Sequence, residues 1–312
     1  FCWHRNMARG GGAVRLCAAA AVCAAAAACS CADVRVACIG GGMAGLAAAR
    51  TLARAGVGVR VFESSDATGG RVRSDRVEGF TLDRGFAVFL TAYPESRAAF
   101  DYDGLDLHPF CPGAMVQTGP GASNRFLVAD PLRLPSATLD TIAFPLASAA
   151  DKLRLVLAIV SLKLSSLEDI FSRPDVPTRI LLEQRWGLSD ALIDGFFRPF
   201  FGGIFLSPLE GQSSVLFEFV LRMFTDGAAA LPAGGLGAAA EQVAAGVRAA
   251  GGQIDLGTRA ERVRLGDAAS GRPHTIVLEG GRQITCDRLV LSCTSREARR
   301  LLRGAGGHGA AG

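Results

Sequence analysis

Residues 34–50 decide the fold and read Val-Arg-Val-Ala-Cys-Ile-Gly-Gly-Gly-Met-Ala-Gly-Leu-Ala-Ala-Ala-Arg. The run 34–39 is short, apolar and rich in β-branched residues, which predicts a fully buried strand of a parallel sheet. Residues 46–55 are good helix formers, and Gly56 ends that run. A second strand-like run follows at residues 57–62. The sequence therefore predicts an α/β unit in which a glycine turn joins a buried strand to a helix.

The glycines of this turn have the spacing of a dinucleotide-binding motif. Gly40, Gly42 and Gly45 stand in the order G-x-G-x-x-G. The first permits a tight turn, the second lets the backbone approach a pyrophosphate, and the third lets helix and strand pack closely. The free N–H groups and the positive dipole end of the helix would face the phosphates. We predict a Rossmann-like fold and a dinucleotide site that comprises Gly40, Gly41, Gly42, Met43, Ala44 and Gly45.

An acidic residue follows the second predicted strand at the position expected for ribose binding. Glu63 lies 18 residues beyond Gly45, and a carboxylate at this spacing accepts hydrogen bonds from ribose hydroxyls. It would repel a 2′-phosphate on that ribose. This argument does not separate NAD from FAD, and both remain open on these residues alone.

Several segments resemble the flavin-containing amine oxidase superfamily, which also holds protoporphyrinogen oxidase and the carotenoid (phytoene) desaturases. The resemblance covers residues 33–302. It starts from the glycine turn with Glu63 and from Thr-Gly-Gly-Arg-Val-Arg-Ser at 68–74. The segments most similar to the desaturase-like branch are Gly-Phe-Thr-Leu-Asp-Arg-Gly-Phe-Ala-Val-Phe-Leu-Thr-Ala-Tyr-Pro-Glu (79–95), Phe-Phe-Arg-Pro-Phe-Phe-Gly-Gly-Ile-Phe-Leu (196–206) and Leu-Pro-Ala-Gly-Gly-Leu-Gly (231–237).

The resemblance implies FAD as the cofactor, with its adenosine ribose on Glu63. It also implies that Gly69, Gly70 and Arg71 face the pyrophosphate and the nearby ribityl chain. The residue types agree, because a glycine pair allows close backbone approach and an arginine fork suits a diphosphate. A backbone contact to adenine is carried over to Val263.

The activity that the resemblance implies is hydride transfer from a hydrophobic small molecule to the flavin N5. No side chain stands out as an acid or base, so the catalytic residues stay unassigned, and no metal site is predicted. The family's closing strand and glycine-rich helix start are not in the sequence, and no lysine follows Lys163; we therefore expect a C-terminally truncated chain. The alternatives are a dinucleotide-binding fragment without turnover and an NAD-linked dehydrogenase.

Five segments make up the predicted domain organisation. Residues 1–32 form a targeting segment or a disordered extension, and residues 304–312 a flexible tail. Residues 33–90 and 231–303 form the two parts of the FAD-binding domain, and residues 91–230 an inserted α+β substrate or cap domain. From residue 236 a helix and strands at 253–256, 260–265, 274–278, 282–286 and 288–292 are expected.

Composition limits the compartment and the partners. Residues 1–32 contain no acid, three arginines and an alanine-dominated stretch, which favours an organellar (plastid-like) or secretory destination over the cytoplasm. The net charge of +4 comes without a clustered basic stripe, so nucleic-acid binding is not indicated. The nine cysteines have neither disulfide nor metal-site spacing.

The predicted cap domain contains two apolar features, each with two interpretations. A helix is expected over residues 147–171, and its apolar stripe is expected to face the core; the alternative is a peripheral membrane contact, since two lysines and Arg154 lie near that face. Eight phenylalanines fall between Phe196 and Phe224, and they would line a hydrophobic substrate cavity or fill the core of the helical domain. The stripe comprises Leu153, Val156, Leu157, Val160, Leu164 and Leu167.

Overall fold

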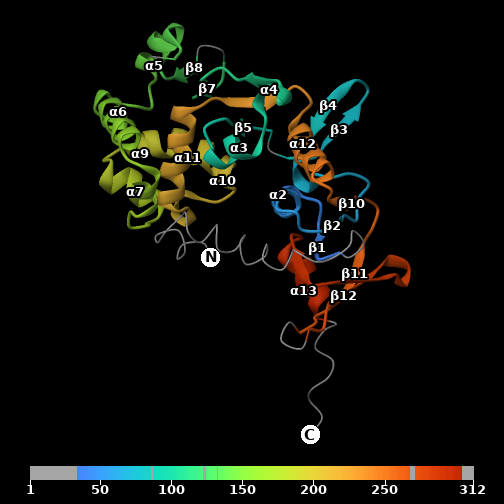
Figure 1. Ribbon diagram of the computed structural model, residues 1–312. Coiled ribbons are helices and arrows are strands. Elements are labelled where there is room, and N and C mark those ends of the chain that lie inside the picture. Colours follow the sequence, from blue (N-terminus) through green and yellow to red (C-terminus); the bar gives the residue numbers. More distant parts are fainter. Residues whose placement is uncertain (1–33, 86, 122–123, 132, 268–270, 304–312) are drawn as a thin grey trace. The chain divides into compact units, whose positions relative to one another are not determined.

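The computed structural model describes residues 34–303 except 86, 122–123, 132 and 268–270 (Figure 1). The predicted targeting segment 1–32 and the predicted tail 304–312 lie outside the described residues, so both remain predictions. Contacts divide the chain into two units. Unit 1 contains the described residues up to Val88, Ala98–Leu107 and those from Leu231 onward, and unit 2 contains Phe89–Arg97 and His108–Ala230.

A parallel sheet lies at the centre of unit 1. Its four strands have the order β10-β2-β1-β14, and all neighbours are parallel. Every residue of β1 is buried, which explains why its sequence is apolar without alternation. The fold predicted from residues 34–62 is therefore confirmed. The strands are β1 (Val36–Ile39), β2 (Val59–Phe62), β10 (Gln253–Asp255) and β14 (Arg288–Leu291).

Different elements cover the two faces of this sheet. On one face, Val36 and Cys38 of β1 pack with residues of α2 (Met43–Arg54) and with Val247 of α12 (Leu236–Ala249). On the other face, Ala37 and Ile39 pack against an antiparallel sheet and helix α13 (Ser295–Leu302). The antiparallel sheet has the order β11-β12-β13, with β11 (Ala260–Arg264), β12 (His274–Leu278) and β13 (Gln283–Cys286). The other elements of unit 1 are η1 (Gly70–Val72), β3 (Ser74–Val77), β4 (Phe80–Asp83), α4 (Tyr102–Leu105) and η7 (Glu279–Gly281).

One segment of the predicted cap domain belongs to unit 1 instead. The Asp101 N–H donates to Gln242 Oε1 at 2.9 Å, and Gln242 Nε2 donates to the Asp101 carbonyl at 2.9 Å. Arg50 Nη1 of α2 also donates to the Ala99 carbonyl at 2.6 Å. These bonds attach residues 98–107 to α2 and α12. Sequence analysis placed the whole range 91–230 in one domain because no local pattern marks such long-range bonds.

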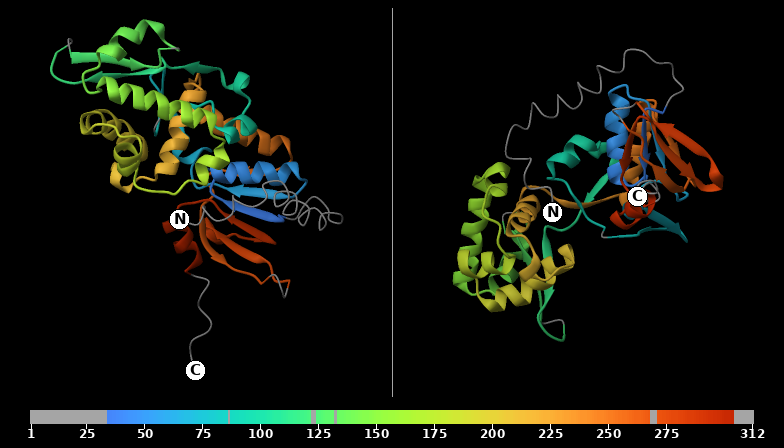
Figure 2. Two further views of the ribbon diagram at one scale, coloured as in Figure 1. Left: turned by 90° about the vertical axis from the view of Figure 1, so that its left-hand side faces the viewer. Right: turned by 90° about the horizontal axis from the view of Figure 1, so that it is seen from below.

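Unit 2 is mainly helical. Strands β7 and β8 form a two-stranded sheet, and β5, β9 and β6 form a three-stranded one. The longest helix is α6, and Figures 1 and 2 show it beside α5 and α7. The elements are β5 (Phe89–Leu90), α3 (Pro94–Ala99), β6 (Leu107–Pro109), β7 (Gly113–Gln117), β8 (Arg125–Ala129), η3 (Pro135–Ala137), α5 (Thr138–Ala143), α6 (Ala149–Leu164), α7 (Leu167–Phe171), α8 (Thr178–Ile180), η4 (Leu181–Arg185), α9 (Asp190–Leu192), η5 (Ile193–Phe197), α10 (Arg198–Phe205), η6 (Leu209–Gly211), α11 (Ser214–Asp226) and β9 (Ala229–Pro232).

The single helix predicted over residues 147–171 is two helices. Ser166 begins a new helix: its hydroxyl accepts from the Asp169 N–H, and the Asp169 carboxylate accepts from the Ser166 N–H, each at 3.0 Å. This reciprocal pair is a capping box, whose S-x-x-D spacing is legible in the sequence. The helical spacing of apolar residues continues across the break, so this spacing alone does not reveal where the first helix ends.

The expectation that the apolar stripe faces the core is wrong for α6. Five side chains of the stripe are 47–83% exposed, whereas Asp151 and Leu162 point inward and are at most 2% exposed. Leu167, in α7, does pack against the core cluster that contains Leu162. The five exposed residues are Leu153, Val156, Leu157, Val160 and Leu164.

Most of the phenylalanine block lies in the interior of unit 2, although Phe200 is 37% exposed. Phe197, Phe201 and Phe217 are at most 1% exposed, and the rings of Phe201 and Phe217 lie 4.5 Å apart between centroids. Neighbouring rings pack in edge-to-face and stacked pairs, which stabilise aromatic clusters. Of the two interpretations of this block, the structure supports the core.

Asp151 fixes helix α6 to the rest of unit 2. Its carboxylate accepts from the N–H and hydroxyl of Ser148, which caps α6, and from the N–H and hydroxyl of Ser189, which caps α9. Burial raises the pKa of the Asp151 carboxyl, but these four hydrogen bonds outweigh it and lower the pKa to about 2.

No helix among the described residues is long and apolar enough to span a membrane.

We predict that Asp151→Asn lowers the free energy of unfolding by about 1–3 kcal/mol at neutral pH, because an amide cannot accept all four bonds. The folded-state pKa lies below the ordinary value of 3.8, so the contribution of Asp151 is present above pH 4 and is lost as the pH falls towards 2. Urea unfolding at pH 7 and pH 3 measures both effects.

The control is Asp169→Asn in the exposed capping box of α7. It should cost less than Asp151→Asn, since Asp169 is accessible to water. Equal losses in the two variants would contradict the role given to Asp151.

Candidate nucleotide-binding site

Two glycines of the turn after β1 are required by the packing of the protein itself. Gly40 has φ +108°, and a Cβ there would lie 3.0 Å from Ser292 Oγ. A Cβ on Gly45 would lie 2.1 Å from the Gly40 carbonyl oxygen and 2.4 Å from Ser292 Oγ. The approach at Gly45 is too close for any side chain, and at Gly40 the positive φ together with the tight approach favours glycine. Helix α2 can therefore begin directly against the end of β1 only with glycine at these positions.

Gly42 has no such internal reason to be glycine. Its φ of −73° suits any residue, and no protein atom lies within 4 Å of where its Cβ would be. It is the N-cap of α2; in the described part of the chain no side chain caps this end, and the first turn holds no acid. The amides of Met43, Ala44 and Gly45 therefore begin the helix beside open space. An anionic group fits this space, which a side chain at position 42 would fill.

The second glycine pair lies directly against the first. The Gly69 N–H donates to the Gly41 carbonyl at 2.9 Å, and Gly69 forms a parallel β-bridge with Gly42. A Cβ on Gly70 would lie 3.4 Å from the Gly42 Cα. Gly69 and Gly70 have φ of +105° and +56°, the left-handed region that favours glycine. The structure thus brings residues 40–45 and 69–70 together, although 23 residues separate the two segments.

Polar side chains from distant segments hold the two glycine turns in place. The Ser292 hydroxyl, at the end of β14, donates to the carbonyls of Ile39 and Gly40 at 3.0 and 2.8 Å. The Thr68 hydroxyl donates to the Glu241 carboxylate of α12 at 3.1 Å. Sequence reasoning assigned no role to Ser292 or Glu241, because no spacing rule connects them to the glycines.

Glu63 lies at the end of β2, with its carboxylate against the first glycine turn. Its Oε2 accepts from the Gly41 N–H at 2.6 Å, and its Oε1 accepts from the N–H and hydroxyl of Ser65, both at 2.8 Å. Burial raises the pKa of the Glu63 carboxyl, but the hydrogen bonds from Gly41, Ser65 and Ser64 outweigh burial and leave the pKa below its usual value. The carboxylate is therefore ionised at neutral pH and keeps acceptor capacity for sugar hydroxyls.

Two arginines follow the second glycine pair, and they differ in their partners. Arg73 forms an ion pair with Asp66 at 2.7 Å. Arg71 is exposed, and its guanidinium has no acid partner among the described residues. A guanidinium with unused donors, on the segment whose glycines lie against the first turn, suits a diphosphate. The residues present thus fit the dinucleotide for which they were predicted.

Val263 is buried in β11, where it faces Ile276 of β12. Its side chain belongs to the core cluster with Phe62, so only its backbone is left for a ligand. Residues 255–258, which precede β11, form two backbone hydrogen bonds with Glu63. The Glu63 N–H donates to the Asp255 carbonyl at 2.9 Å, and the Thr258 N–H donates to the Glu63 carbonyl at 2.7 Å. The adenine contact at Val263 remains a prediction.

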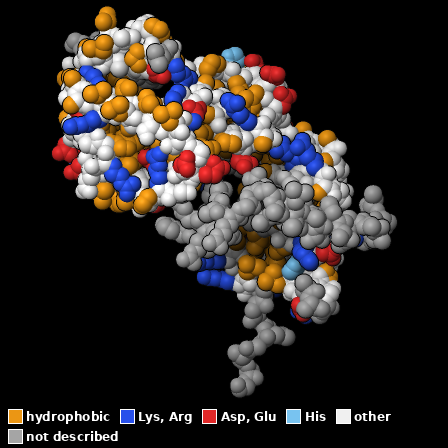
Figure 3. All heavy atoms as spheres, turned by 60° about the vertical axis from the view of Figure 1, so that its left-hand side comes forward, with side chains coloured by type: hydrophobic (Ala, Val, Ile, Leu, Met, Phe, Trp, Pro, Cys, Tyr) orange, Lys and Arg blue, Asp and Glu red, His pale blue; other side chains and the backbone are white. Residues whose placement is uncertain are grey.

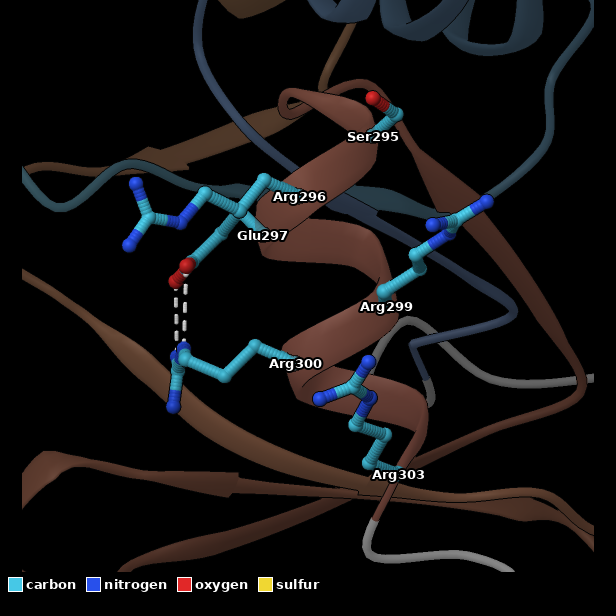
Figure 4. A pocket seen from close by; sticks show the side chains of 6 residues that line it. All are labelled: Ser295, Arg296, Glu297, Arg299, Arg300 and Arg303. Atoms are coloured by element: carbon cyan, nitrogen blue, oxygen red, sulfur yellow. Dashed lines mark hydrogen bonds and ion pairs between the residues drawn. The ribbon is translucent and has the colours of Figure 1, made fainter.

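A shallow depression beside α13 holds none of the predicted site residues. Figure 4 shows its lining, in which Arg300 pairs with Glu297 at 2.7 Å. Arg300 also donates to the carbonyls of Ala260 and Glu261, which attaches α13 to β11. The depression has a volume of about 560 Å³ and is lined by Ser295, Arg296, Glu297, Arg299, Arg300 and Arg303. Within the described residues no group of acids, histidines and cysteines could hold a metal ion.

Comparison with known proteins agrees with this geometry. Residues 43–305 match the model of the flavin-containing amine oxidoreductases. The chain belongs to this family. Coproporphyrinogen III oxidase from Propionibacterium freudenreichii subsp. freudenreichii is 30% identical over 183 residues, 56% of this chain and 32% of that protein. 4,4′-Diapophytoene desaturase from Staphylococcus haemolyticus is 36% identical over 80 residues, 24% of this chain and 16% of that protein.

Solved structures show the same fold. An oxidoreductase from Methanosarcina mazei superposes with a TM-score of 0.62 at 20% sequence identity, over 87% of this chain and 62% of that one. The chain spans about a third of the length of the coproporphyrinogen oxidase. Membership of the family confirms the predicted resemblance and FAD as the cofactor.

We predict that Gly42→Val abolishes FAD binding while the protein stays folded. The valine side chain would fill the open space beside the amides of α2, and the fold would lose about 1 kcal/mol because valine is a poor N-cap. Flavin absorbance after gel filtration measures occupancy, and urea unfolding measures stability.

Gly45→Ala is the matched control, since its methyl group would collide with the Gly40 carbonyl. It should cost at least about 1–3 kcal/mol of stability, with flavin loss following from unfolding. Full flavin occupancy in Gly42→Val would rule out the proposed site.

We further predict that Glu63→Gln weakens FAD binding about tenfold, because hydrogen bonds to a charged acceptor are stronger than those to an amide. Glu261→Gln, at an exposed position of β11, should bind FAD as the parent does. Fluorescence titration of the apoprotein with FAD compares the two, and equal affinities would remove Glu63 from the site.

Proposed function

We propose that the protein is an FAD-dependent oxidoreductase that removes a hydride from a hydrophobic small molecule. The observation that carries this proposal is the open turn at Gly42, because its glycine has no role in the packing of the protein and leaves helix amides beside empty space. Glu63 and Arg71 add an ionised carboxylate and an unpaired guanidinium near that turn, in a chain of the flavin-containing amine oxidoreductase family.

The residues of this chain bind and orient the cofactor. The pyrophosphate is neutralised by the amides of Met43 and Ala44 and by the Arg71 guanidinium. The Glu63 carboxylate accepts hydrogen bonds from the ribose hydroxyls. Bound FAD supplies the two-electron acceptor, and a second oxidant must then restore it. Loss of a hydride leaves a cation that must also release a proton, to water or to a base of the protein, and no residue of this chain is assigned that role.

The substrate class follows from the relatives. Two of them are named for oxidising a porphyrinogen and desaturating a phytoene, which supports a hydrophobic substrate for this chain. A phytoene is a hydrocarbon that partitions into lipid, and a substrate of that kind favours a peripheral contact between the enzyme and a membrane surface.

We expect the purified, FAD-loaded protein to lose its flavin absorbance when a porphyrinogen or a phytoene is added without oxygen, and to regain it when oxygen or a quinone is supplied. A short aliphatic diamine serves as the polar control. Anaerobic absorbance spectroscopy gives the rate of bleaching for each compound.

The outcomes separate the alternatives. Bleaching by the diamine alone would contradict a hydrophobic substrate. Tight FAD binding without bleaching by any compound would indicate a dinucleotide-binding chain without turnover. Binding of NADH with no affinity for FAD would indicate a nicotinamide-linked dehydrogenase.

A further inference from the structure

Helix α6 of unit 2 has two apolar faces, and only one of them is packed against protein. The inward face includes Leu162, which is 2% exposed, and begins at the buried Asp151. The outward face consists of five aliphatic residues that are 47–83% exposed. A surface helix normally presents polar residues to water on its outward side. The outward residues are Leu153, Val156, Leu157, Val160 and Leu164.

The outward residues form one continuous stripe. At 3.6 residues per turn their spacing places them within an arc about 100° wide along the whole helix. Helix α5 also carries two exposed aliphatic residues, Leu139 and Ile142, which are 79% and 64% exposed. Lys152 links the two helices, since its ammonium donates to the Ile142 carbonyl at 2.6 Å. Contiguous apolar surface of this kind marks an interaction site rather than a solvated helix.

Cations border the stripe on both sides. The same helical geometry places Lys152 and Lys163 along one edge and Arg154 along the other. The only acid of α6 is Asp151, which is buried on the opposite face. The cations contact backbone carbonyls of unit 2, Lys163 at Thr225 and Arg154 at Gly187, with donors to spare. Asp226 lies 4.0 Å from Lys163 and offsets part of its charge.

This arrangement fits the surface of an anionic lipid bilayer. Aliphatic side chains enter the boundary between headgroups and acyl chains, and lysine and arginine beside them reach the phosphates. A second copy of the chain suits the surface less well, because a two-fold contact would bring identical cationic edges together. Figure 3 shows hydrophobic and basic side chains interspersed on a face of unit 2.

We propose that the outward face of α6, with Leu139 and Ile142 of α5, is a membrane-docking surface that lies in the plane of an anionic bilayer. Asp151 and its four hydrogen bonds hold the helix so that this face stays outward. The proposal stands apart from the flavin chemistry, since docking requires neither FAD nor substrate.

The test is co-sedimentation of the full chain with vesicles of phosphatidylcholine alone or mixed with phosphatidylserine. We expect association with the mixed vesicles, about fivefold weaker after Lys163→Gln, the effect of one cation near an anionic surface. The double variant Leu157→Gln/Leu164→Gln should weaken it at least tenfold, because two leucine side chains lose apolar burial. FAD content and thermal unfolding should stay those of the parent, as both residues are exposed.

The matched control is Leu206→Gln. Leu206 is 89% exposed in the same unit but follows α10, outside the docking surface. Three results would overturn the proposal: a parent chain that binds neither kind of vesicle, an equal loss in the Leu206 variant, or a dimer without vesicles that the double variant dissociates. The last result would assign the surface to a second copy.

Discussion

The close approach of helix α2 to the end of β1 is the constraint on which unit 1 depends. A side chain at Gly45 would collide with the Gly40 carbonyl, which in turn accepts from Ser292. With glycine there, the helix starts directly after the strand and its amides face the space beside Gly42. The same turn provides the carbonyl of Gly41 that receives the Gly69 N–H. A displacement of α2 would therefore separate both glycine segments of the site at once.

The electrostatic character of the site follows from the same arrangement. Glu63 keeps its charge although it is half-buried, because backbone and hydroxyl donors stabilise the ionised form. Arg71 and the helix amides supply positive potential where a diphosphate would lie. One side of the site is thus suited to sugar hydroxyls and the other to phosphate. Residues arranged in this way would position the cofactor, whose flavin would supply the redox chemistry.

Unit 2 illustrates how far hydrophobic periodicity can be interpreted. The spacing of the stripe in α6 correctly predicts a helix but does not say which side meets the protein. Leu155 and Leu162 supply a second apolar face, and Asp151, a charged residue, marks the buried side because four hydrogen bonds satisfy it. Charged side chains are usually exposed and leucines buried, and here the positions are reversed. The hydrogen bonds that Ser148 and Ser189 donate explain why the carboxylate is buried.

The sequence by itself determined the α/β fold, the glycine turn, the acid after the second strand and the family, since each depends on short-range order along the chain. Gly40, Gly42, Gly45 and Glu63 carry their information within 24 residues. The tertiary structure alone decided that Gly69 lies against Gly41, that Ser292 and Glu241 support the two turns, and that residues 98–107 join unit 1. It also decided which face of α6 is outward. These features depend on hydrogen bonds and packing between residues far apart in the chain, for which local sequence has no signal.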